Sequence, residues 1–193
     1  MPITDRETRS YETHPAIMKI AALFSILVTL LICAGCTSKQ HTPTATEVAS
    51  AQELFDQTTR DYHLPSADAQ GAAKEKLLQQ AAAGYESLLR KYPKSMPWAA
   101  QSLRSIGNVR AEQGKLDEAV KVYASVESRY PKADWEILQS WKSAADLLWD
   151  SNRHPEAKQF YQKLVARFDT PSASAVIKTI VRASQNRLTR SAS

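Results

Sequence analysis

The chain repeats itself at a shift of 38 residues, and this constrains its fold more than any other feature of the sequence. Three segments align at that spacing: LLRKYPKS from Leu88, VESRYPKA from Val126 and LVARFDTP from Leu164. Alanines and tyrosines upstream share the register, at Ala81, Ala119, Ala157, Tyr85, Tyr123 and Tyr161. Such a period is typical of proteins built by stacking one supersecondary unit.

Each unit is predicted to be a pair of helices joined by a short turn. Gly114 and Asn152 are in register, and both residue types tolerate the positive φ that closes such a turn. The alanine allows the two helices to approach closely, and the tyrosine one turn later fills the next layer. A Tyr-Pro pair ends the second helix, because proline lacks an N–H and restricts its predecessor. Only stacked hairpins can bury their apolar faces, so the sequence predicts an all-α solenoid.

The side chains at these positions resemble the tetratricopeptide repeat. One unit fits the large, small, alanine, aromatic and proline positions of that family with Leu103, Gly107, Ala119, Tyr123 and Pro131. The next unit fits four positions with Trp141, Ala145, Ala157 and Tyr161, while its proline is displaced to Pro171; an earlier, more divergent unit retains Ala81, Tyr85 and Pro93. The resemblance implies a solenoid of about three tetratricopeptide-like repeats between about residues 48 and 190. The helix from about residue 172 to residue 190 is predicted to cap it.

The period of 38 residues exceeds the family's usual period of about 34. Lengthened units are similar to those of lipoproteins in outer-membrane barrel assembly and of the Tol-Pal-associated coordinator. Ahead of the repeats, the spacing of Val48, Ala51, Phe55 and Tyr62 predicts another helix. We expect the segment from His63 to Ser66 to break that helix, with Ser66 as the N-cap of the next.

Both cysteines of the chain lie in the stretch LLICAGCTS, at Cys33 and Cys36. Lys19 is followed by an uncharged, mostly apolar run that ends at Gly35, which is the order of a secretory signal. The segment Cys-Ala-Gly-Cys resembles the lipobox of bacterial lipoproteins, although an aliphatic residue is usual where Cys33 stands. The resemblance implies cleavage after Gly35 and lipidation of Cys36. A plain signal peptide with an incidental cysteine and an uncleaved anchor are the alternatives.

These features predict four segments along the chain. Residues 1–17 are a non-native or dispensable extension, because Met18-Lys19 would be an ordinary lipoprotein start. Residues 18–35 are the signal peptide, residues 36–46 a flexible tether and residues 47–193 the repeat domain. Thr37 follows the predicted lipidated cysteine where an Asp would direct retention in the inner membrane. The similarity to Gram-negative lipoproteins therefore favours the outer membrane, at its periplasmic face, over the inner membrane.

The sequence gives no indication of catalysis. No cysteine follows Cys36, which excludes an intramolecular disulfide and a thiolate metal site in the mature chain. No two histidines share helical spacing for a metal, and no phosphate-binding glycine loop or nucleophile elbow is present. We predict no enzyme activity, no cofactor, no metal and no nucleic-acid partner. The net charge of +5 selects no partner by itself.

The resemblance to tetratricopeptide repeats implies a partner-binding groove lined by the first helix of each unit. In this chain its positions are occupied by Arg104, Asn108, Ala111, Lys142, Asp146 and Trp149. Arg104 with Asn108 is similar to half of the clamp by which some family members hold a peptide carboxylate.

The predicted function is a protein–protein interaction scaffold that docks a peptide or helix of other envelope proteins. A structural membrane accessory, pilotin-like or Tol-Pal-like, is the main alternative; an enzyme or ligand carrier with an unrecognised pocket is another. The last helix carries Lys178, Arg182, Arg187 and Arg190, and no acid follows Asp169. This basic face either contacts anionic lipids or an acidic partner, or is simply solvated.

Overall fold

The computed structural model describes residues 42–190, without the side chain of Arg190, and this part of the chain is helical with no strand. The hairpin helices, in chain order, are α2 (Ala45–Thr58), α4 (Gly71–Lys91), α5 (Trp98–Glu112), α6 (Leu116–Arg129), α7 (Asp134–Asp150) and α8 (His154–Phe168). Between α2 and α4 lie a π-helical stretch, η1 (Thr59–His63), and the short α3 (Leu64–Ser66). The chain ends with α9 (Ala175–Arg190).

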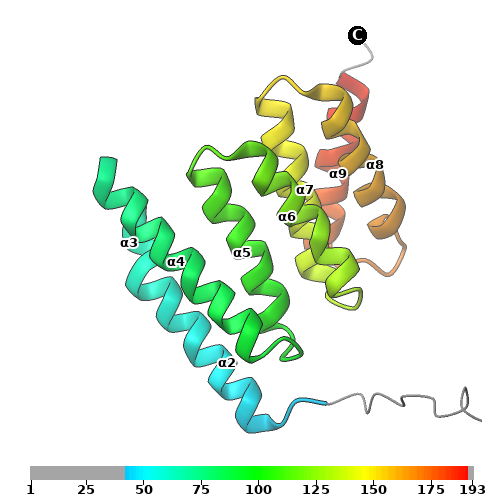
Figure 1. Cartoon of the computed structure of the whole chain (residues 1–193). Coiled ribbons are helices and arrows are strands. Elements are labelled where there is room, and N and C mark those ends of the chain that lie inside the picture. Colours follow the sequence, from blue (N-terminus) through cyan, green and yellow to red (C-terminus); the bar gives the residue numbers. More distant parts are fainter. Residues whose placement is uncertain (1–41, 191–193) are drawn as a thin grey trace, which may run out of the picture. The chain divides into compact units, whose positions relative to one another are not determined.

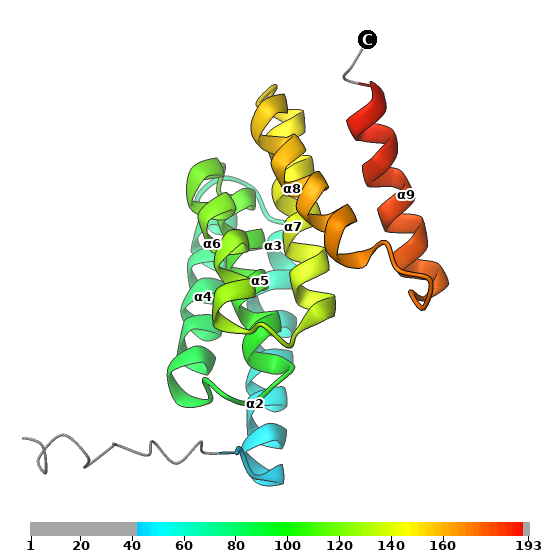
Figure 2. The same cartoon turned by 90° about the vertical axis from the view of Figure 1, so that its right-hand side faces the viewer.

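The helices stack in the order of the sequence (Figures 1 and 2). Helices α2 and α4, α5 and α6, and α7 and α8 form three hairpins, each hairpin packs on the next, and α9 packs on α8. The first helices also contact one another, α2 against α5 and α5 against α7. The predicted all-α solenoid of about three repeats with a C-terminal capping helix is therefore confirmed.

The turns and helix ends follow the predicted chemistry. Gly114 has φ 72° and Asn152 has φ 59°, so both hairpin turns use the left-handed region. Helices α4 and α6 end at Lys91 and Arg129, directly before the tyrosine of each Tyr-Pro pair.

The alanine and tyrosine layers are buried in every repeat. Their exposed fractions are 0 % for all three alanines and at most 3 % for the tyrosines: Ala81, Ala119, Ala157, Tyr85, Tyr123 and Tyr161. Gly107 lets α5 lie against α6, because a Cβ there would stand 2.5 Å from the ring of Tyr123. The small residue of the repeat pattern is thus required by the tyrosine of the same repeat.

The predicted helix break at residues 63–66 is wrong. The chain stays helical through η1 and α3 to Ser66, and the interruption comes at residues 67–70. The N–H of Leu64 bonds to Thr59 O, one residue further back than in an α-helix, so Pro65 falls in the first turn of a new segment, where its missing N–H is tolerated. Ser66 is no N-cap, since its buried hydroxyl donates to His63 O at 2.6 Å.

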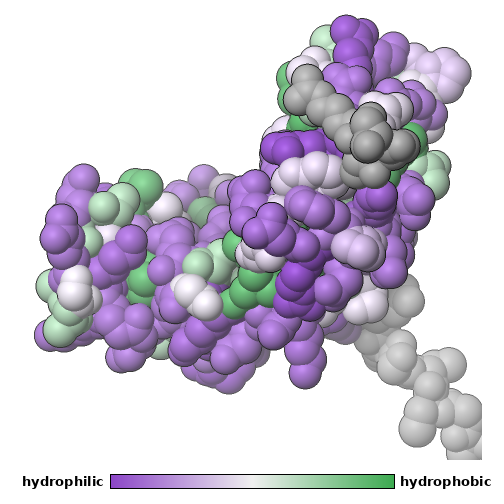
Figure 3. All heavy atoms as spheres, turned by 90° about the horizontal axis from the view of Figure 1, so that it is seen from above, coloured by the Kyte–Doolittle hydropathy of each residue, from purple (hydrophilic) through white to green (hydrophobic). Residues whose placement is uncertain are grey.

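Aromatic side chains pack both between and within the hairpins. Phe55 of α2 lies 5.4 Å from Tyr85 and 5.6 Å from Trp98 between ring centroids, which ties the first hairpin to the second. Trp141 of α7 lies 6.1 Å from Phe168 of α8. Figure 3 shows that hydrophilic side chains cover most of the surface in that view, with smaller hydrophobic areas between them.

The N-terminal end of the described region is held by a capping box. Thr44 accepts a hydrogen bond from the N–H of Glu47, and the Glu47 carboxylate accepts one from the N–H of Thr44. Helix α2 begins at Ala45, so the last two residues of the predicted tether are helical. The predicted signal peptide, Gly35 and Cys36 lie outside residues 42–190.

Candidate functional site: the first-helix face

The structure brings the predicted groove residues together on two neighbouring helices. Arg104 and Asn108 lie one turn apart on α5, and Lys142, Asp146 and Trp149 follow each other along α7. All five are partly exposed. We call the surface formed by these five side chains the first-helix face.

Tyrosines of the second helices hold this face in place. The Tyr123 hydroxyl donates to Asn108 Oδ1 at 2.8 Å, and the Tyr161 hydroxyl donates to Asp146 Oδ1 at 2.5 Å. In the first hairpin, the Tyr85 hydroxyl lies 2.8 Å from Thr59 Oγ1. The repeat tyrosine therefore has the same role in the second and third hairpins, where its ring fills the core and its hydroxyl fixes a polar side chain of the first helix. In the first hairpin the partner of its hydroxyl, Thr59, belongs to η1.

Burial favours the neutral form of these phenols, which is the form that can donate. It raises the pKa of Tyr85, and it raises the pKa of Tyr123 to about 12. The pKa of Tyr161 is raised further, first by burial and then by the hydrogen bond and the negative charge of Asp146.

Arg104 is engaged in an ion pair between two repeats. Its Nε lies 2.5 Å from Oε2 of Glu136 on α7, and the exposed fractions of the two side chains are 19 % and 7 %. The carboxylate of Glu136 already offsets the positive charge that would attract a peptide carboxylate to Arg104. The geometry therefore gives no support to the half-clamp that Arg104 and Asn108 suggest.

Lys142 is paired in the same way, within its own helix. Its Nζ lies 2.5 Å from Asp146 Oδ2, and both side chains are more than one-third exposed. These two residues and Tyr161 line a small hollow whose other wall is formed by Ala183, Ser184 and Arg187 of α9. The capping helix thus belongs to the site, which the repeat pattern could not indicate because α9 lies outside it.

Trp149 packs where α7, α8 and α9 meet. Its ring lies 4.4 Å from that of His154 and 6.2 Å from that of Tyr161, and the Arg187 guanidinium stands 5.1 Å from its centroid. Arg187 therefore makes a cation–π contact that fixes the edge of the first-helix face. Of the five predicted residues, Trp149 is the one that packs against a hydrophobic cluster.

A further polar cluster continues along α5, and sequence reasoning missed it. Nδ1 of His63 lies 2.9 Å from the Tyr85 hydroxyl and Nε2 lies 3.1 Å from Glu112 Oε1. The hydrogen bond with His63 lowers the pKa of the Glu112 carboxyl, against a smaller opposing effect of burial. His63 lies one turn after Thr59 only because the helix continues through η1, which the sequence did not predict. The spacing of residues in the sequence therefore could not indicate this cluster.

Among residues 42–190, no group of three or more His, Cys, Asp or Glu side chains is arranged to hold a metal ion. No described helix is long and apolar enough to cross a membrane.

Comparison with known proteins supports the repeat assignment. The sequence profile of the tetratricopeptide repeat matches residues 73–134, which extend from α4 to the first residue of α7. A search of curated proteins found no match. Tetratricopeptide repeats generally mediate protein–protein interaction and are typically non-catalytic, so a protein partner is the expected ligand of this solenoid.

Proposed function

We propose that this repeat protein is a non-catalytic scaffold, lipid-anchored at the periplasmic face of the bacterial outer membrane, that supports assembly of an envelope complex. Its first-helix face would dock a peptide or helix of another envelope protein. The observation that carries the proposal is the row of polar side chains on α5 and α7, each partly exposed and already held by a neighbour.

This row is preorganised for binding. Ordering a long polar side chain on association costs roughly 0.5–1.5 kcal/mol. Asn108 is fixed by Tyr123, and Asp146 by Tyr161 and Lys142, before any partner arrives. A partner segment therefore meets donors and acceptors in fixed positions, which favours specific docking over loose adhesion.

The ion pairs also limit the chemistry of the partner. Because Arg104 and Lys142 each face a carboxylate, the first-helix face offers no unpaired cation of its own. We therefore expect recognition of an internal segment by hydrogen bonds and shape, and not of a free C-terminal carboxylate.

The proposed anchoring rests on the sequence. Lys19, the apolar run to Gly35 and the small residues before Cys36 support residues 18–35 as a signal peptide. On this proposal residues 1–17 are dispensable, residues 36–46 connect the lipid to the domain and residues 47–193 form the domain. Lipid chains on Cys36 would supply the membrane affinity, at about 0.8 kcal/mol for each buried methylene.

Metabolic labelling with an alkyne fatty acid tests the anchor. The chain should incorporate the label, Cys36→Ser should abolish labelling, and Cys33→Ser is the matched control that should keep it. Label retained in the Cys36→Ser variant would contradict lipidation at this residue.

Photocrosslinking in intact cells tests docking. A photoreactive residue at Lys142, on the first-helix face, should capture a defined envelope protein. The same residue at the exposed Lys121 of α6 is the control and should capture nothing specific. Capture from Lys121 alone would instead assign the chain the role of a structural accessory that uses its second helices.

A further inference from the structure

The two ends of the helix stack carry opposite charge. Helix α2 contains three acidic and no basic residues, and no Lys or Arg occurs between Lys39 and Arg60. Helix α9 contains four basic and no acidic residues. Helix α2 lies at one end of the stack and α9 at the other (Figure 1). The solenoid therefore has an acidic end and a basic end.

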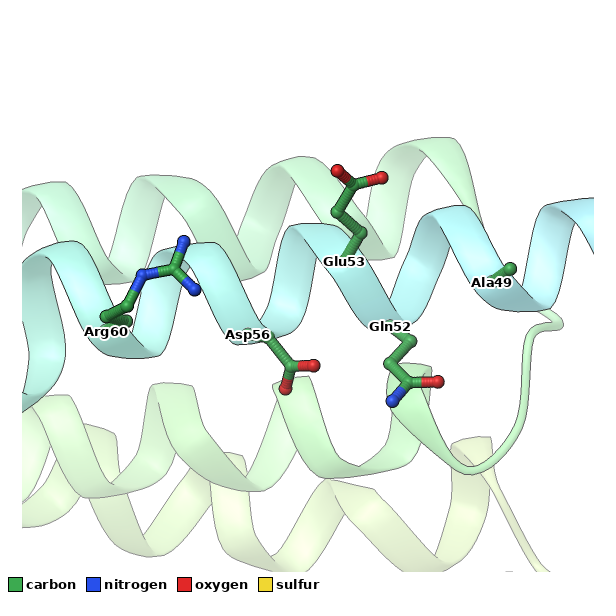
Figure 4. Close-up of a pocket in the computed structure, with 5 residues that line it drawn as sticks. All are labelled: Ala49, Gln52, Glu53, Asp56 and Arg60. Atoms are coloured by element: carbon green, nitrogen blue, oxygen red, sulfur yellow. The ribbon is translucent and has the colours of Figure 1, made fainter.

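The acidic end is the face of α2 that points away from the core. Figure 4 shows Glu53 and Asp56 projecting from α2 in different directions beside a shallow hollow, with Arg60 one turn further along. Both carboxylate side chains belong to exposed residues. Arg60, the only cation lining this hollow, lies 3.2 Å from Asp61 through its Nε, so the face keeps a negative balance.

The basic end is the flank of α9 beside the connection between α8 and α9. Lys178 and Arg182 are exposed and line a hollow with Pro171, Val181 and Gln185. The one acid at this hollow, Asp169, accepts a hydrogen bond from Gln185 at 2.9 Å. Lys178 donates only to a neutral group, Pro171 O at 3.0 Å. Two exposed cations thus share this hollow with one carboxylate among the described residues.

We propose that a second copy of this chain docks on α9 through its α2, in a head-to-tail contact between the basic and the acidic end. The occupant is chosen by charge complementarity: the exposed carboxylates of one copy match the exposed amine and guanidinium of the next. The contact joins two different surfaces, so each copy keeps one free end, and association gives a ring or an open filament.

Such an array would present one first-helix face per copy. Neither end surface includes the five residues of that face, so docking and self-association can occur together. Several linked faces raise the effective concentration for a partner with repeated segments. The inference goes beyond the docking proposal and does not depend on it.

Chemical crosslinking gives the direct test. The full chain is kept in a detergent whose density matches that of the buffer, with more micelles than protein chains. It is then treated with a carbodiimide, which joins a carboxylate to a lysine amine without a spacer. An equal mixture of ¹⁵N-labelled and unlabelled chains should yield mixed-isotope peptides that link Lys178 to Glu53 or Asp56. Links found only between peptides of the same isotope, or links between other residues, would contradict the contact.

Charge reversal gives the second test, read by sedimentation velocity. Glu53→Lys with Asp56→Lys, and separately Lys178→Glu with Arg182→Glu, should each weaken self-association about tenfold or more, because like charges then face each other. Mixing the two variants should restore association, since each supplies the end that the other needs. Lys91→Glu with Lys121→Glu matches the charge change of the α9 variant at exposed sites elsewhere and should leave association unchanged.

Two further outcomes would overturn the proposal. The first is a wild-type chain that sediments as a monomer at low ionic strength, where attraction between exposed charges is strongest. The second is a wild-type chain that binds phosphatidylglycerol vesicles more tightly than phosphatidylcholine vesicles and forms no crosslink between chains. In that case the charge-reversed α9 variant would lose the preference for phosphatidylglycerol. That result would assign the basic end to an anionic membrane.

Discussion

At the scale of single residues, the contact between Gly107 and Tyr123 has the clearest consequence. Glycine to alanine inside a helix ordinarily stabilises it by roughly 0.5–1 kcal/mol. Here the new Cβ would stand 2.5 Å from the ring, so Gly107→Ala should instead lower the free energy of unfolding by about 1–3 kcal/mol. Urea denaturation measures this. The loss should shrink when Tyr123→Leu is added, and an equal loss in both backgrounds would show that the ring is not the cause.

The Arg104–Glu136 pair supports a second prediction at this scale. Arg104→Met leaves a carboxylate that is 7 % exposed without its partner and should cost about 3–5 kcal/mol of unfolding free energy. Adding Glu136→Leu should recover most of it, because the unpaired buried charge is then removed. Lys142→Met is the control, since its pair is more exposed and contributes about 1 kcal/mol or less. Equal losses at both sites in urea denaturation would contradict the difference in burial.

At the scale of helices, the repeat register predicted the hairpins well and their surroundings poorly. Alanine and tyrosine at fixed spacing mark the second helices, and the Tyr-Pro pairs predict where α4 and α6 end. The π-helical stretch could not be predicted, because Pro65 ends helices in general and is accommodated here only by a shift in hydrogen-bond register. The pairing of Arg104 was equally hidden, since Glu136 lies five residues before Trp141, where the repeat pattern of that unit begins.

Helix α9 supports the prediction that belongs to this scale. Val181 is 3 % exposed against the preceding hairpin, whereas Val176 is 58 % exposed on the same helix. Val181→Asp should therefore lower the free energy of unfolding by more than about 2 kcal/mol, because it buries a carboxylate without a partner. Val176→Asp is the matched control and should change it by less than about 0.5 kcal/mol. Similar thermal unfolding of the two variants would mean that α9 does not seal the last repeat.

For the whole molecule, one tyrosine hydroxyl in each repeat makes folding sensitive to alkaline pH. Burial raises the pKa of Tyr85, Tyr123 and Tyr161 in the folded state, so folding favours the neutral phenols. This contribution to stability is complete below the unfolded pKa of about 10 and is lost as pH rises through the folded pKa, about 12 for Tyr123. Because the three residues lie in three stacked hairpins, helix loss and tyrosinate formation should coincide above pH 10.

Tyrosinate absorbance and far-UV circular dichroism, recorded together during an alkaline titration, measure that coupling. Tyr123→Phe should make stability less dependent on pH between about 10 and 12, because one of the linked protons is removed. Tyr92→Phe is the control, since Tyr92 is only partly buried at the end of α4 and lies outside the tyrosine layer. Full ionisation of the tyrosines with the helices intact would mean that the phenols are open to solvent. The tyrosine layer would then not be what fixes the first-helix face.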